Sequence, residues 1–105
     1  MVTANFFMTA SGSCKGFSVS GHSGYSVSGS DIVCASVSSA VMLTVNTANE
    51  FFGLNATVKV EDNKISCSVQ NSTKESDKLF LSLKEHLSAV SEEFPKYLKV
   101  NISEV

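Results

Sequence analysis

The segment DIVCASVSSAVMLTVNTANEFF, residues 31–52, contains neither glycine nor proline, and its apolar residues fall on most sides of a helix. This pattern predicts a helix from Ile32 to about Phe52 that is buried on more than one face. Gly53 follows, and glycine is common just after the end of a helix. Small residues within the segment, such as Ala35 and Ala40, would let the helix lie close to a sheet.

Segments on both sides of this helix predict the sheet. Residues 2–10 and 17–22 alternate with period two across the turn at 11–13, and residues 56–60 and 65–69 do so across the turn at 61–64. A second helix is expected over about 73–93, capped by Asn71 or Ser72 and stopped by Pro95, with a closing strand at 97–102. Its inward stripe is Leu79, Leu83, Leu87 and Val90, joined by Phe80. The order ββαββαβ predicts an α+β fold: one mostly antiparallel or mixed sheet with two helices packed on it.

Size and charge restrict the classes of function. The 105 residues suit a single domain, residues 1–105, with one core. A net charge of −2 and no cluster of Lys or Arg argue against direct binding of nucleic acid. The apolar run at 32–43 is broken by serines and too short for a bilayer, so no membrane contact is expected.

Three cysteines, Cys14, Cys34 and Cys67, give an odd number without a CxxC pair. This number disfavours a disulfide framework and a four-ligand zinc site. Residues 1–6 show no basic start of a secretory signal, and reduced thiols then favour a cytoplasmic protein.

His22 and Cys34 carry the most informative chemistry. His22 closes a predicted strand, and Cys34 follows near the start of the predicted helix, with Asp31 as the expected N-cap. A thiol at a helix start is favoured as a thiolate, and free N–H groups there can hold a developing oxyanion. A histidine within reach can accept the thiol proton. Ser38, one turn beyond Cys34, could reach such a site by a hydrogen bond.

Simpler interpretations of these residues remain open. A free cysteine at a helix start is more often a small buried apolar residue, and a histidine at a strand end is usually a surface residue. We expect Cys14 and Cys67 to be structural and His86 to flank the apolar stripe of its helix. Three aromatic residues are possible pocket walls, although core roles are commoner: Tyr25, Phe51 and Phe52.

The quoted residues resemble a known family. Gly-His-x-x-Tyr at 21–25, Gly-x-Asp-Ile-Val-Cys-Ala at 29–35 and Val-Ser at 37–38 are similar to the ribosomal-processing cysteine proteases of bacteria, called Prp. The resemblance is strong over residues 21–38, and the length and element order agree across the whole chain.

The resemblance implies a cysteine endopeptidase that removes a short N-terminal extension from the twenty-seventh protein of the large ribosomal subunit, without metal or cofactor. It implies Cys34 as nucleophile and His22 as base, with Asp31 and Ser38 at supporting positions. It also implies a homodimer and a lid loop over the site. Residues 23–30 match that loop, and Gly24 and Gly29 are its flexible points.

Two other functions use the same residues. The chain could be a non-catalytic, ribosome-associated binding module that keeps the fold without the activity. It could also be a thiol redox sensor, although nothing in the sequence places a resolving cysteine beside Cys34. Cleavage of the extended ribosomal protein separates the protease from both.

Overall fold

The computed structural model describes residues 1–21 and 30–105 of the protein. Its elements are β1 (Val2–Met8), β2 (Cys14–Ser20), α1 (Ser30–Asn46), the π-helical turn η1 (Thr47–Phe51), β3 (Thr57–Glu61), β4 (Lys64–Ser68), α2 (Lys74–Glu93) and β5 (Leu98–Glu104). The predicted α+β class and the order ββαββαβ are confirmed.

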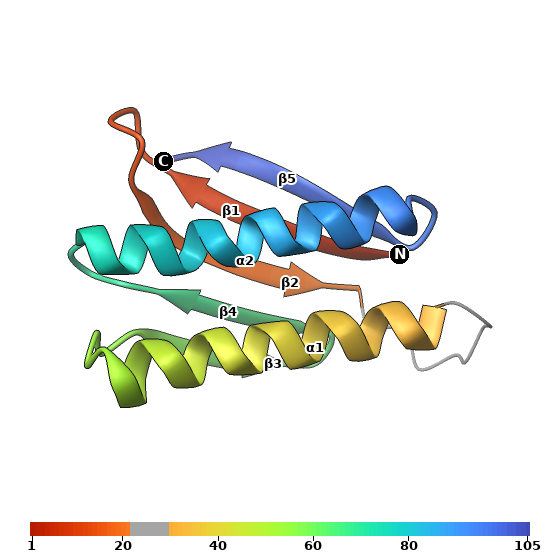
Figure 1. Ribbon diagram of the computed structural model, residues 1–105, viewed down its shortest axis with the longest axis horizontal. Coiled ribbons are helices and arrows are strands. Elements are labelled where there is room, and N and C mark those ends of the chain that lie inside the picture. The colour runs from red at the N-terminus through yellow and green to blue at the C-terminus, as the bar shows by residue number, and fades with distance from the viewer. Residues whose placement is uncertain (22–29) are drawn as a thin grey trace.

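The described strands form one mixed sheet in the order β3-β4-β2-β1-β5. β1 and β5 are parallel, and the other neighbouring pairs are antiparallel. Both helices lie side by side on one face of this sheet and run in opposite directions (Figure 1). The β2 end that precedes residue 22 and the start of α1 lie toward the same end of the molecule (Figure 1).

Aromatic rings join the sheet to α2. Phe6 of β1 and Phe17 of β2 have ring centroids 5.8 Å apart, and Phe17 meets Phe80 of α2 edge to face at 5.6 Å. All three side chains are fully buried. The predicted inward stripe of α2 is confirmed at Phe80, Leu83 and Leu87, whereas Leu79 and Val90 are only partly buried.

The helix α1 packs on the sheet through a row of valines. Val33, Val37 and Val41 recur at helical spacing and are buried in the core. By length and composition alone, Ile32–Phe51 is apolar enough to cross a membrane. The buried valines account for part of that apolar character, because they are needed to cover the sheet.

The end of α1 differs from the uninterrupted helix that the sequence predicts. The α-helix stops at Asn46 and a single π turn follows, in which the N–H of Phe52 donates to the Thr47 carbonyl at 3.1 Å. Gly53 then adopts a φ of +60°, as expected of a glycine after a helix. The Asn49 side chain fixes the exit of the chain, because its amide accepts from the Ala56 N–H at 2.7 Å and donates to the Ala56 carbonyl.

The start of α2 lies slightly later than predicted. Thr73, rather than Asn71 or Ser72, is the N-cap, and it forms a capping box with Ser76. The Ser76 N–H donates to Thr73 Oγ1 at 3.1 Å, and the Thr73 N–H donates to Ser76 Oγ at 2.8 Å. The helix ends at Glu93, just before Pro95, as predicted.

The central ring cluster leads to a test of the fold. We expect Phe17→Ala to lower the free energy of unfolding by about 3–5 kcal/mol, because it opens a cavity between both layers. Phe51→Ala is the matched control, since Phe51 is 82% exposed, and should change stability by less than about 0.5 kcal/mol. Urea unfolding followed by circular dichroism measures both, and equal losses would contradict the assigned core.

Candidate active site

Cys34 lies on the face of α1 that turns toward the sheet. Val37, Ser38 and Val41 follow it at three, four and seven positions, which places all four residues on one side of the helix. The Cys34 side chain is partly buried and packs against the core cluster. The thiol is therefore held by packing yet keeps some exposure to solvent.

The start of α1 corrects one sequence prediction. The helix already includes Ser30 and Asp31, so Asp31 lies in its first turn instead of at the N-cap. Cys34 is the fifth helical residue, one beyond the four whose N–H groups lack partners within a helix. The N–H groups that could hold a developing oxyanion are therefore those of the residues before Cys34, and this use of them stays a prediction.

A groove, here called the hairpin groove, lies between α1 and the β3–β4 hairpin and has a volume of about 220 Å³. Val37, Ser38, Val41 and Met42 of α1 line one wall. Since three of these four share the face of Cys34, the groove extends along the helix from the turn that follows the thiol. Sequence reasoning missed this groove, because the opposite wall comes from residues 60–65, far away in the chain.

Gly21 brings the end of β2 to the hairpin groove. Its N–H donates to the carbonyl of Asn63 at 3.0 Å, and Asn63 lines the hairpin groove. Gly21 has a φ of +93°, and a Cβ there would collide with the carbonyl oxygen of Met1. Gly21, which directly precedes His22, is thus fixed beside the hairpin groove. The other wall of this groove is formed by α1, starting one turn after Cys34.

The remaining predicted site residues have different outcomes. His22, Gly24, Tyr25 and Gly29 lie outside the described residues. Ser38 is exposed and lies in the wall of the hairpin groove, one turn after Cys34. The joint placement of His22, Asp31 and Cys34 stays a prediction.

Cys14 and Cys67 occupy environments unlike that of Cys34. Both are buried, and desolvation by burial raises the pKa of Cys14 and raises the pKa of Cys67 to about 11. The Cys14 thiol also donates to the Gly16 carbonyl at 3.4 Å. Raised pKa values keep these thiols protonated at neutral pH, so the prediction that both are structural agrees with their environment.

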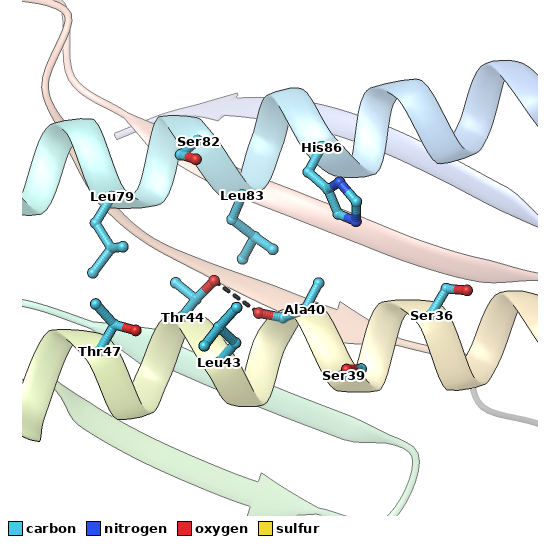
Figure 2. A pocket seen from close by; sticks show the side chains of 10 residues that line it. All are labelled: Ser36, Ser39, Ala40, Leu43, Thr44, Thr47, Leu79, Ser82, Leu83 and His86. Atoms are coloured by element: carbon cyan, nitrogen blue, oxygen red, sulfur yellow. Dashed lines mark hydrogen bonds between the residues drawn. The ribbon is translucent and has the colours of Figure 1, made fainter.

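A second cavity, here called the inter-helix cavity, lies on the other side of α1. It has a volume of about 570 Å³ and is lined from α1 by residues that include Ser36, Ala40 and Leu43. Successive helical residues are about 100° apart, so this face is roughly opposite to that of Cys34. Figure 2 shows His86 of α2 pointing toward α1 within this cavity. His86 is exposed and belongs to the flank of its helix, as predicted.

The core role, which the sequence analysis gave as the commoner one for Phe51 and Phe52, is wrong, and nothing in the described part of the structure supports their alternative role as walls of the site. Both are exposed at the far end of α1, about 25 Å along the helix axis from Cys34, and neither lines the hairpin groove.

Within residues 1–21 and 30–105, no group of three His, Cys, Asp or Glu side chains could hold a metal ion.

A family model described as cysteine protease Prp matches residues 1–99. The chain belongs to this family. A sequence search of curated proteins gives no match. Membership in the Prp family makes the partly exposed cysteine on α1 the candidate nucleophile.

Solved structures have the same fold. The Streptococcus mutans protein SMU.848 is 21% identical, with a TM-score of 0.88, over 100% of this chain and 99% of its own. The S. aureus ribosomal processing protease Prp with a substrate peptide is 18% identical, with a TM-score of 0.87, over 98% and 100% of the two chains. The same S. aureus protease with a covalently linked product peptide is 22% identical, with a TM-score of 0.83, over 98% and 100%.

The thiol environments lead to a test by alkylation. With iodoacetamide at pH 8, we expect Cys34 to react at least about 10-fold faster than Cys14 or Cys67. With a pKa of about 11, Cys67 has only about one thiolate per thousand molecules at this pH, and burial blocks access as well. Peptide mass mapping over a time course measures the rates. In urea all three should react alike, and equal rates in the folded protein would contradict the assignment.

The backbone at Gly21 leads to a second test. We expect Gly21→Ala to lower the free energy of unfolding by clearly more than Gly12→Ala, and to lower activity as well. Both glycines have φ near +90°, so both variants incur the left-handed strain of about 1–2 kcal/mol. Only at Gly21 does the new Cβ also meet backbone, since nothing lies within 4 Å of Gly12. Urea unfolding compares the pair, and equal losses would show that the Met1 contact is unimportant.

Proposed function

We propose that this protein is a cytoplasmic cysteine endopeptidase that removes the short N-terminal extension of a large-subunit ribosomal protein, the twenty-seventh. The family match over residues 1–99 supports the reaction class. The name of the S. aureus relative, a ribosomal processing protease, supports the substrate class. Its complex with a covalently linked product peptide supports a covalent intermediate.

Cys34 carries this proposal. Of the three cysteines, all of which lie in the described part of the chain, Cys34 is partly buried, whereas Cys14 and Cys67 are buried with raised pKa values. A nucleophile needs access to substrate, and the partly exposed position of Cys34 on α1 allows it.

In the proposed mechanism His22 accepts the thiol proton while Cys34 Sγ attacks the carbonyl carbon of the scissile peptide. The tetrahedral intermediate collapses, the C–N bond breaks, and the leaving amine takes the proton from His22. A water molecule then attacks the thioester, with His22 accepting its proton. The C–S bond breaks, and the proton returns to the Cys34 sulfur.

The other residues of the proposed site support this dyad and the bound peptide. Asp31, in the first turn of α1, takes a supporting position in this proposal. Ser38 is close enough along α1 to contact a bound peptide. The loop with Gly24 and Gly29 closes over the bound substrate. We also propose a homodimer as the working form, without a cofactor, nucleic acid or membrane as partner.

Intact mass spectrometry tests the proposal directly. Wild-type protein and Cys67→Ala should remove a short N-terminal peptide from the extended ribosomal protein, because Cys67 takes no part in the reaction. Cys34→Ala and His22→Ala should each lower the rate by about 10³-fold or more. Circular dichroism checks that the variants fold.

Other results would point to other functions. Tight binding of the precursor by wild-type protein without any product would favour the binding module. Equal loss of cleavage in Cys67→Ala and Cys34→Ala, with both folded, would contradict Cys34 as the nucleophile.

A further inference from the structure

We propose that the turn between β3 and β4 positions the base of the candidate site, and that Asn63 in this turn is the residue responsible. Asn63 acts through the backbone of Gly21, which directly precedes His22, so it is a positioning residue and not a catalytic one. This inference rests on the proposed function, in which His22 accepts the thiol proton of Cys34.

Asn63 has a left-handed backbone conformation. Its φ is +63°, and among the described residues other than glycine only Asn55 shares a positive φ. Asparagine adopts this conformation more readily than most residues. Glu61 pairs with Lys64 across the hairpin, so Asp62 and Asn63 alone form the turn. A tight turn with a left-handed second residue favours glycine or asparagine at that position, and this conformation fixes the direction of the Asn63 carbonyl.

The carbonyl of Asn63 holds the chain that leads to His22. The pairing of β2 with β4 ends at Ser20 and Lys64. Beyond this pair, the N–H of Gly21 donates to the Asn63 carbonyl at 3.0 Å. The bond therefore adds one connection past the ends of both strands. The conformation of the turn thus decides where the residue before His22 is held.

Gly21 is also confined on its other side. A Cβ on Gly21 would collide with the carbonyl oxygen of Met1, which shows how closely the two backbones approach. The start of β1 is itself anchored, since the Val2 N–H donates to the Tyr97 carbonyl at 2.8 Å. Gly21 therefore lies between two fixed segments. A displaced Asn63 carbonyl changes the direction in which the chain continues after Gly21.

This direction matters because proton transfer depends on a short distance. A general base must come within about 2.6–3.2 Å of the atom that gives up the proton. A misplacement of about 1 Å can lower a rate by about 100-fold. Packing against the core holds Cys34 on α1, so in the proposed dyad the reach of His22 depends on where its chain begins.

Cleavage kinetics on the two left-handed asparagines test the inference. Asn63→Val should lower kcat for the extended ribosomal protein about 10-fold and change KM by less than about 2-fold, because valine disfavours a positive φ. Asn63→Gly keeps the conformation and removes the side chain, so it should keep kcat within about 2-fold of wild type. Asn55→Val is the matched control: its position is equally exposed, lies in the link before β3, and should change kcat by less than about 2-fold.

Circular dichroism checks that the variants fold, and Asn63→Ala is the milder substitution if Asn63→Val does not. Equal losses in Asn63→Gly and Asn63→Val would assign the effect to the side chain and overturn the inference. Equal losses in Asn55→Val and Asn63→Val would reduce the effect to general strain and overturn it as well.

Alkylation of Cys34 by iodoacetamide at pH 7 tests the same link without a peptide substrate. Asn63→Val should lower the alkylation rate at least about 3-fold when His22 is present, because a displaced base takes the thiol proton less readily. In the His22→Ala background the same substitution should change the rate by less than about 1.5-fold, because Asn63 acts only through the base. Equal reductions in both backgrounds would show another route to the thiol and overturn the inference.

The alkylation experiment separates this inference from the proposed function. Failure of the wild type to cleave the ribosomal protein would overturn the protease proposal, and the double-variant comparison would still decide whether Asn63 acts through His22. If His22→Ala alone leaves alkylation of Cys34 unchanged, the two residues form no dyad, and the positioning role of Asn63 is overturned with it.

Discussion

The contact of Phe17 with Phe6 and Phe80 holds the two layers of the molecule together. Phe17 stands on the middle strand of the sheet and meets α2 edge to face, a geometry that adds about 0.5–1.5 kcal/mol beyond burial. With α2 fixed on this face, the space left for α1 is the remaining strip over β2 and the hairpin. The valine row at 33, 37 and 41 then determines how α1 is turned about its axis. That rotation places Cys34 toward the hairpin groove instead of the inter-helix cavity.

The reactivity of Cys34 must depend on more than the helix. The favourable field at a helix start falls off within the first turn, and Cys34 is the fifth helical residue. The N–H groups ahead of it, at residues 30–33, are in a better position to meet a negative charge than its own. In the proposed mechanism the base therefore has the larger part in forming the thiolate, so the path of the chain after Gly21 matters as much as the helix.

Much of the fold follows from local patterns. Alternation in β1, the stripe of α2 and the glycine after α1 each reflect one element and its burial, and each was predicted from sequence. The cap at Thr73 and the helix start at Ser30 differ from prediction by one or two residues, since several residues there can fill the same role. The buried environments of Cys14 and Cys67 could also be foreseen from their places beside a turn and in an apolar row.

The candidate site was less predictable than the fold. The motif around Cys34 predicts the nucleophile, but the hairpin groove needs Met42 and Val60 brought together from separate elements. The pattern of apolar residues within one segment cannot predict a contact between two segments. Phe51 and Phe52 were expected in the core, or as pocket walls, because they are aromatic, and the structure leaves both exposed beyond the end of α1 that is far from Cys34.

The π turn at Thr47–Phe51 has a consequence for how the chain can vary in length. A π turn takes up one more residue than an α turn over a similar rise, and here it lies about 20 Å along the helix from Cys34. A residue gained or lost in this connection can be absorbed by changing between the two kinds of turn. The valine row and the Cys34 thiol would then keep their orientation about the helix axis, because the change of turn lies beyond them. The C-terminal end of α1 can thus accommodate changes of length in the link to β3 without moving the end of the helix that holds Cys34.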